Sequence, residues 1–573
     1  MKTLILHRKG TAGGALIMTL IMAAVALILV AGVLSWSAGN ARLAARANQY
    51  TRAVAGAEAA DEKINTRISS DYLSGGELQV ISNLNTYRQT VPTSTDSSYW
   101  TNWEFSDAQG NVGRTLVLQG GITNYTVLTG PYAGLNGYAS TYSIISDARE
   151  LNQPQNVVAG VLEQVLLTRI PIFQFAMYSS GEMEISCGQP FTVKGPVHAN
   201  GPLYVEPDNA LTFQSSVTAV GNVLFQRDPL DTRGSPAGSV TYTVQPKSGQ
   251  PALTLPIGMT NTPQAVREII EPPPAGESPT SPLGRLRYFN QVDMMVIVSN
   301  TTVRVTSGYF NNFATVIPSN QYSLFVLTNT SFYDWRENKT IRAINLNIGA
   351  LTTWSATNTN LHVALNRDLF SVYVYDKRTF AAGNLGAVRV YNGVQLPSLG
   401  LTVATHDPLY VQGHYNQTIS SNLGSARTSG SKPASLVGDA ITVLSQNWSD
   451  ANSAALLSSR GAGQTTVNAA FLTGVVETTL GQYSGGMENF PRFMESWGSG
   501  NVFTYNGSMV KMFPSAIATN VWGQTNVYDP PARNWTYDNN FNTPTLLPPL
   551  TPSLQVVTRG QWSTLAANST NAP

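Results

Sequence analysis

Few residues in this chain have the types and spacing that chemistry requires. The densest group is the stretch Thr-His-Asp-Pro-Leu-Tyr-Val-Gln-Gly-His-Tyr-Asn, which contains His406, Asp407 and His414. Two imidazoles and a carboxylate are ligands that zinc accepts in proteins. However, Pro408 follows the aspartate directly, and the stretch is typical of a strand between turns. The sequence therefore favours a structural role, and we predict no metal and no cofactor. His198 lies within a turn between short apolar stretches, and we expect it to be a turn or stacking residue.

An acidic pair, Glu182 and Glu184, is the other candidate for chemistry. Residues two apart share one face of a strand, and two like charges can raise the pKa of one carboxyl. Some polysaccharide lyases and hydrolases use clustered carboxylates in this way, but an exposed strand face explains the pair equally well. The chain has no Gly-x-Ser-x-Gly elbow, phosphate loop or zinc-protease helix motif. We therefore expect no enzyme. The alternative, a membrane-anchored enzyme acting on envelope polysaccharide, requires a groove lined by three or more carboxylates or by a His–carboxylate pair.

Composition narrows the function classes further. The 573 residues carry a net charge of +1, and only 12% of them are charged. Because no basic surface is indicated, we predict that the protein does not bind nucleic acid. The one cysteine, Cys187, excludes an intramolecular disulfide, and we expect it to be buried rather than paired between molecules.

The element that dominates the sequence is an apolar run near the beginning. Residues 10–41 contain no charged side chain, and they follow a basic leader with Lys2, Arg8 and Lys9. About 20 helical residues cross a bilayer core, so this run is long enough to span one. A cleavable signal peptide is the alternative, with residues 35–38 as a weak cleavage site. We predict a retained transmembrane helix whose anchoring side chains are Leu16, Ile17, Leu20, Ile21, Val25, Leu27, Ile28, Leu29 and Val30.

The helical pattern continues beyond the apolar run. The next segment, to residue 68, is rich in alanine and free of proline, and alanine is the best helix former. Gly56 is the one weak point, and small residues four apart, such as Ala53 and Ala57, leave a narrow face for close packing. We expect one helix over residues 14–69, roughly 80 Å long by the helical rise per residue.

A basic leader, a glycine, a membrane helix and its amphipathic continuation resemble the amino terminus of type IV pilins. Residues 13–17, Gly-Gly-Ala-Leu-Ile, are most similar to the minor pilin and pseudopilin branch of the PilX (GspK-like) kind. The resemblance implies that a prepilin peptidase cuts after Gly13, or after Gly14 so that Ala15 comes first. It also implies that other pilins contact the helix. The fifth mature position is then Met18 or Thr19, where major pilins have glutamate. A signal anchor that no peptidase cuts is the alternative.

The remainder of the chain predicts β structure. Residues 100–118 alternate, turn and alternate again, which indicates a hairpin. After residue 170, very short apolar strands separated by Gly- or Asn-containing turns are typical of coils of a parallel β-helix, in which each coil stacks on the next. An ordinary β-sandwich is the alternative. The segment Val-Lys-Gly-Pro-Val-His-Ala-Asn-Gly, and later Gly-Gly-Met-Glu-Asn-Phe-Pro-Arg-Phe, resemble segments of large PilX-like proteins with β-helical bodies.

Two short helices are expected within this β-rich part. One covers residues 263–270 in a Pro-rich insertion. The other is indicated by Phe490, Phe493, Met494 and Trp497, whose spacing places them on one helical face.

We expect a mainly β fold with a long N-terminal α-helix: a pilin-like helix plus sheet, followed by a right-handed parallel β-helix. The predicted segments, in chain order, are a leader (1–13), a transmembrane and amphipathic helix (14–70), a pilin-like β region (71–169), first β-helix coils (170–225), a Pro-rich insertion (226–290), an irregular β region (291–434), further coils with a packed short helix (435–515) and an extended C-terminal strap (516–573).

These features predict a non-enzymatic minor pilin or pseudopilin-like protein of a type IV pilus or related secretion system. The helix would cross the inner membrane once, and the body would be extracytoplasmic, in the periplasm or at the cell surface. Its partners would be the lipid bilayer, other pilins, the prepilin peptidase and a surface or polysaccharide ligand, with a role in assembly or adhesion. A static envelope scaffold that never enters a filament is a further alternative.

Overall fold

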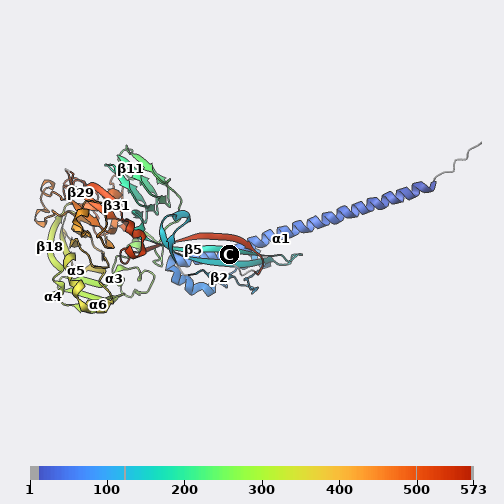
Figure 1. Ribbon diagram of the computed structural model, residues 1–573, viewed down its shortest axis with the longest axis horizontal. Coiled ribbons are helices and arrows are strands. Elements are labelled where there is room, and N and C mark those ends of the chain that lie inside the picture. The colour runs from blue at the N-terminus through green and yellow to red at the C-terminus, as the bar shows by residue number, and fades with distance from the viewer. Residues whose placement is uncertain (1–11, 122–123, 499, 569–573) are drawn as a thin grey trace, which may run out of the picture.

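A computed structural model describes residues 12–121, 124–498 and 500–568. The molecule is elongated, with a long helix at one end, an antiparallel sheet in the middle and a large β-rich body at the other end (Figure 1). Helix α1 (Ala12–Tyr87) continues well beyond the predicted end near residue 69. It is kinked at Gly76, whose φ of 75° is readily adopted only by glycine.

The second half of α1 lies across an antiparallel sheet. In its main path, β1 (Trp103–Ser106) pairs with β4 (Asn136–Glu150), β4 with β5 (Val158–Pro171), and β5 with β32 (Ser553–Leu565). Alanines and larger apolar residues of the helix pack on this sheet. A helix followed by strands on which it packs agrees with the helix-plus-sheet layout that the sequence predicted.

The turn of the predicted hairpin over residues 100–118 is present, since Ser106 and Val112 form an antiparallel bridge across it, but the strands on its two sides do not pair with each other beyond that bridge. Both β1 and β2 (Leu116–Gln119) pair with β4, and so does β3 (Asn124–Val127). The 15-residue strand β4 is long enough to pair with all three short strands at successive positions. Hydrogen bonding of β1 and β2 to β4 therefore takes the place of most of the hairpin pairing that the alternating apolar pattern suggests.

The first part of the body is built from very short parallel strands in three ladders. Strand β6 (Met177–Ser179) pairs with β9 (Val197–Ala199), and β9 pairs with β12 (Val217–Ala219). Paired positions lie twenty residues apart, so the buried Val197 stacks between Met177 and Val217. The second ladder contains β7 (Met183–Ile185), β10 (Leu203–Val205) and β13 (Val223–Leu224), and the third contains β8 (Phe191–Val193), β11 (Ala210–Phe213) and β14 (Ser239–Tyr242).

The first of these ladders continues into strands from much later in the chain. Met509 of β30 (Met509–Pro514) pairs in parallel with Met177 of β6. Beyond β30 follow, in spatial order, β27 (Ala470–Val475), β24 (Ala434–Gly438), β22 (Leu401–Thr405), β20 (Ser371–Asp376) and β15 (Met294–Val298), and then the antiparallel strands β16 (Val303–Tyr309) and β17 (Asn312–Ile317). Two separate stretches of the chain therefore form one open sheet.

A second large sheet shares the main hydrophobic core with the first. Its strands are β18 (Val326–Asp334), β19 (Lys339–Asn347), β21 (Asn384–Gly393), β23 (Leu409–Tyr415), β25 (Ile441–Leu444), β26 (Thr465–Asn468), β28 (Arg492–Phe493), β29 (Val502–Gly507) and β31 (Ala532–Tyr537). Residues 291–434, for which the sequence predicted irregular β structure, thus supply regular strands to both sheets.

The two predicted short helices have different outcomes. Helix α2 (Pro263–Arg267) is present, and Thr262 caps it by accepting a hydrogen bond from the Ala265 amide. The helix expected around Phe490–Trp497 is wrong: a 3₁₀ turn (Met487–Asn489) leads into β28, which pairs with β25. The four side chains of the proposed face are buried, but Pro491 has no amide hydrogen for a helical bond. The remaining α-helices of the described residues are α3 (Tyr288–Gln291), α4 (Ser319–Tyr322), α5 (Ile348–Thr357) and α6 (Thr359–Leu365).

The segment 516–573, predicted as an extended strap, contains two strands that belong to different sheets. Strand β31 pairs with β29 in the body, whereas β32 returns to the antiparallel sheet and pairs with β5 along most of its length. In Figure 1 this last strand runs beside β5. Of the aromatic residues in this segment, Trp535, Tyr537 and Phe541 are buried, but Trp562 is half exposed.

Candidate assembly helix and carboxylate cluster

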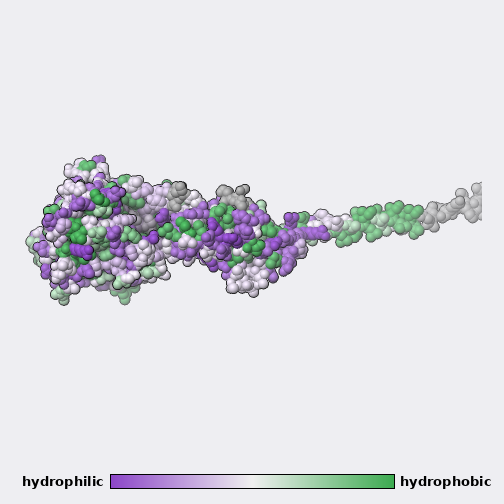
Figure 2. Space-filling model, turned by 90° about the horizontal axis from the view of Figure 1, so that it is seen from below, coloured by the Kyte–Doolittle hydropathy of each residue, from purple (hydrophilic) through white to green (hydrophobic). Residues whose placement is uncertain are grey.

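The first half of α1 has no packing partner within the described structure. The exposed fractions of the predicted anchor residues range from 50% for Val25 to 71% for Ile28. Figure 2 shows apolar side chains gathered along this outer part of the helix. Within the described residues, α1 is the one helix long and apolar enough to cross a membrane. Side chains of this character on every face of a helix are unfavourable in water and favourable in a bilayer.

The predicted processing residues lie at the start of α1. Gly13, Gly14 and Ala15 are helical, and Gly14 and Ala15 are exposed. The basic leader, including His7, lies outside the described residues. Cleavage after Gly13 or Gly14 therefore stays a prediction.

The second half of α1 is closely fitted to the sheet. Ala53, Ala57 and Ala60 are almost completely buried. A Cβ atom placed on Gly56 would lie 2.4 Å from Cζ3 of Trp103, well inside van der Waals contact. The glycine that seemed a weak point of the helix is therefore a point of close approach between helix and sheet.

One buried acid interrupts this apolar contact. Asp61 is fully buried, and neither carboxylate oxygen has a hydrogen-bond partner. Burial raises the pKa of Asp61 well above its ordinary value. The nearby Ser146 hydroxyl lowers the pKa in part, and the carboxylates of Glu163, Glu58 and Asp147 raise it further. Its periodic spacing in the helix would have placed it on the packed face, but the sequence analysis did not single it out.

A charged group links the returning strand to this region. Arg559 of β32 pairs with Glu62 of α1 at 2.5 Å and with Glu163 of β5 at 3.3 Å. Asn65 donates a hydrogen bond to the same Glu163 carboxylate at 3.0 Å. The last strand of the chain is thus tied to the first helix.

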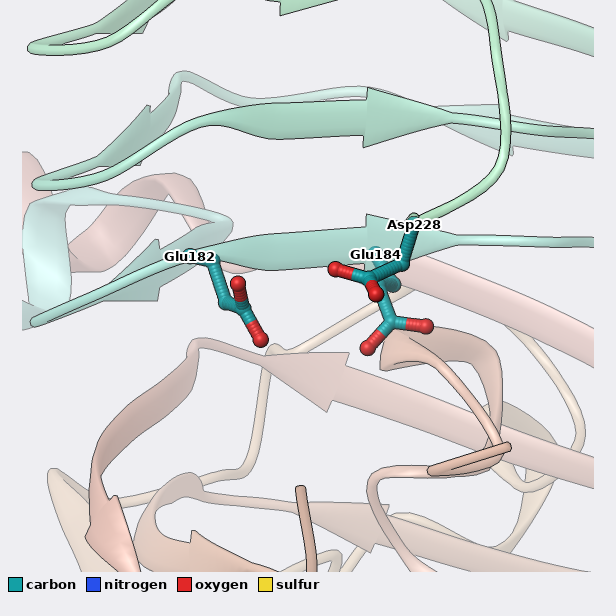
Figure 3. Close-up of side chains that lie close together, drawn as sticks. All are labelled: Glu182, Glu184 and Asp228. Atoms are coloured by element: carbon teal, nitrogen blue, oxygen red, sulfur yellow. The ribbon is translucent and has the colours of Figure 1, made fainter. Parts of the chain in front are cut away.

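In the body, Glu182 and Glu184 are joined by Asp228, which the sequence did not suggest. One ligand oxygen from each lies within 4.8 Å of the others. The two glutamates extend to the same side of the ribbon, and Asp228 meets Glu184 (Figure 3). Contrary to the exposed strand face that was considered, Glu184 and Asp228 are buried, and burial raises the pKa of Glu184 to about 7.

The hydrogen bonds of this cluster explain its stability without a ligand. Glu184 accepts hydrogen bonds from Thr478 Oγ1 at 2.7 Å and Ser484 Oγ at 3.2 Å, and Asp228 accepts one from the Leu230 amide. The cluster has the oxygen donors that a divalent cation prefers. Three carboxylates do converge, as the enzyme alternative requires, but two are buried and bonded to neighbouring loops. The described residues therefore give no positive evidence for catalysis.

The histidines and the cysteine have structural surroundings. His198 is buried, its ring stacks on Tyr178 at 5.8 Å, and burial lowers its pKa to about 4, so the predicted stacking role is confirmed. His406 approaches Asp407 at 3.4 Å, whereas His414 accepts a hydrogen bond from the Thr466 amide. Among the described residues, these three do not come close enough together to share a metal ion, whereas the oxygens of Glu182, Glu184 and Asp228 do. Cys187 is buried, as expected.

Comparisons with known proteins give little further information. No protein-family model matches the chain, and no curated protein matches it. Among solved structures, the chain is similar to the competence-associated pilin ComZ from Thermus thermophilus, with 12% sequence identity over 90% of this chain and 97% of that chain, and with a TM-score of 0.30. A similarity of this size does not show a family.

Proposed function

We propose that the chain is a non-enzymatic, membrane-anchored minor pilin or pseudopilin-like protein of the PilX kind. The observation that carries this proposal is the contrast along α1. Its first half is apolar and exposed on all sides, and its second half is seated on an antiparallel sheet. A soluble protein gains nothing from the first half, but a protein held in the inner membrane needs it.

The proposed mechanism is associative. The outer half of α1 lies in the bilayer as a single span and packs against the helices of other pilins, where small residues such as Gly32 and Gly39 permit close approach. The body then lies outside the cytoplasm, in the periplasm or at the cell surface. There it serves assembly or adhesion through a surface or polysaccharide ligand.

The path of the chain supports the proposal that the β-rich body is carried as a firmly attached unit outside the cytoplasm. Residues 172–552 leave the antiparallel sheet at the end of β5 and return to it at the start of β32, which is the partner of β5. The body is thus attached to the antiparallel sheet through two neighbouring strands, β5 and β32, rather than through one flexible linker. We propose that its parallel ladders are coils of a right-handed β-helix, a shape that extends outward with little internal motion.

The experiment that tests this proposal is mass spectrometry of the amino terminus of the full chain, purified from membranes of cells that contain a prepilin peptidase. The expected mature protein begins at Gly14 or Ala15 and stays in the membrane fraction after carbonate washing. A Gly13→Leu, Gly14→Leu double variant should keep the leader and remain membrane-bound.

Two other outcomes of this measurement would contradict the proposal. An intact leader on the unaltered chain would indicate a static anchored scaffold. A freely soluble protein that begins beyond Ala38 would indicate a cleaved signal peptide, and the pilin interpretation would be wrong.

A further inference from the structure

A cavity of about 600 Å³ opens between the first coils and the late segments of the body. Its wall is formed by the turn after β7, by loops before and after the 3₁₀ turn Met487–Asn489, and by the segment that leads into β31. This volume lies within the range of small-molecule sites in proteins. The cavity is separate from the cluster of Glu182, Glu184 and Asp228, which does not line it.

The cavity has an aromatic wall that is held in place. Trp522 is half-buried, and its indole N–H donates a hydrogen bond to the Tyr528 hydroxyl at 3.0 Å. The Tyr483 ring meets Trp522 edge-on at 5.4 Å. Aromatic rings fixed in this way offer an apolar face beside polar groups, which suits the alternating C–H faces and hydroxyl edges of a sugar.

Arg533 is held by the same network. Its Nη2 donates to Asn489 Oδ1 at 3.0 Å, and the Tyr528 hydroxyl donates to the same oxygen at 2.9 Å. The charges of Arg533 and Glu488 act on each other, but within the described residues the two side chains form no direct ion pair, and Nη1 of Arg533 donates no hydrogen bond. Its buried Nε has no acceptor, and neither has the indole N–H of the buried Trp497.

The carboxylates of the cavity wall are already engaged. Glu488 accepts hydrogen bonds from the Tyr483 hydroxyl at 2.9 Å and from the Ser186 amide at 3.1 Å. Asp208 pairs with Arg227 at 2.6 Å. The unmet hydrogen-bonding capacity of these side chains is therefore that of donors, namely Nε and Nη1 of Arg533 and the indole N–H of Trp497.

We infer that this cavity binds an acidic saccharide, a short oligosaccharide that carries a uronate carboxylate. The carboxylate accepts hydrogen bonds from Arg533, since a planar guanidinium and a carboxylate are complementary. A sugar ring lies against Trp522. The inference deepens the proposed function by naming a ligand class for the body, but it depends only on the cavity, so a chain with its leader intact should bind equally well.

The test is calorimetric titration of the detergent-solubilised full chain with trigalacturonate and, as a neutral match, with its methyl ester. We expect the acid to bind at least tenfold more tightly than the ester. Arg533→Gln should weaken binding of the acid tenfold or more and remove the preference, because a hydrogen-bonded charge pair is lost. Trp522→Ala should weaken both ligands, and Arg304→Gln, on an exposed position of β16, should change neither.

Circular dichroism and melting of each variant separate loss of binding from loss of folding. If Arg533→Gln does not fold, the comparison of acid with ester on the unaltered chain, together with Trp522→Ala, still decides the matter. Equal binding of acid and ester, no binding of either, or tighter binding of triglutamate than of trigalacturonate would each overturn the inference.

Discussion

Replacement of Asp61 by asparagine should stabilise the contact between α1 and the sheet at neutral pH. Both carboxylate oxygens are buried without a well-formed hydrogen bond, and burial raises the pKa of Asp61 despite the nearby Ser146 hydroxyl. The carboxylates of Glu163, Glu58 and Asp147 raise the pKa further. Asn keeps the shape and is still a buried polar group, but it does not titrate, so the variant removes only the cost of keeping Asp61 protonated in the folded state. That cost is about 1.4 kcal/mol for each pH unit between the unfolded pKa and the raised folded pKa. We therefore expect the free energy of opening this contact to rise by about 1–3 kcal/mol at pH 7.

The pH dependence of this effect has a definite sign. Because the folded pKa is raised, both folded and unfolded states are protonated below the unfolded value of about 3.9, and the carboxyl then carries no ionisation penalty. Above that pH the unfolded state ionises first, and stability falls until the pH reaches the folded pKa. The advantage of Asp61→Asn should therefore be absent near pH 3.5 and present at pH 7.

The assay is hydrogen exchange, read by mass spectrometry, of peptides from β4 and β5 in both proteins at matched pH values. A rise of 1–3 kcal/mol slows exchange through opening by roughly 5- to 150-fold. Asp96→Asn is the control: the hydrogen bond from Lys63 lowers the pKa of exposed Asp96 to about 2, so this variant should not stabilise the contact at pH 7. Faster exchange in Asp61→Asn at pH 7, or an equal gain at pH 3.5, would refute the reasoning.

Two further predictions concern the returning strand and the thiol. Leu554→Ala removes a fully buried side chain of β32 and should cost about 2–5 kcal/mol, seen as faster hydrogen exchange in β5, whereas Trp562→Ala, on an exposed position of the same strand, should have little effect. Equal effects of the two variants would contradict the assigned register. Burial raises the pKa of the Cys187 thiol to about 12. At pH 8 its reaction with a disulfide reagent should therefore be about a thousandfold slower than that of an ordinary thiol, and urea should restore the ordinary rate. A fast reaction of the folded chain would show that the turn after β7 opens readily.

The parts of the fold that local sequence controls were predictable. The charge-free run and the alanine-rich continuation predicted α1, because helix formation depends on neighbours within one or two turns. The glycines and asparagines that separate short apolar stretches likewise predicted short strands after residue 170. The prediction that Phe490 and Trp497 are buried was also correct. Their helical spacing did not predict the backbone conformation, because the segment between them forms β28 and pairs with β25.

Pairings between distant parts of the chain were not predictable. The sequence does not show that Met509 stacks on Met177, or that Leu554 pairs with Ile170. Nor does it show that Asp228 joins the two glutamates, or that Arg533 reaches a cavity beside Trp522. These contacts depend on the register of whole sheets, and a short strand is compatible with many partners until the others are in place.

The sequence by itself thus determined that a long apolar helix begins this protein and that short strands follow it, because both features depend on hydrophobic pattern and backbone preference over a few residues. Only the tertiary structure decided that the last strand completes the sheet under the first helix and that the body lies between β5 and β32. It also decided which polar groups are left without partners. The physical reason is that burial and strand pairing at long range are set by the packing of the entire chain, which no local pattern encodes.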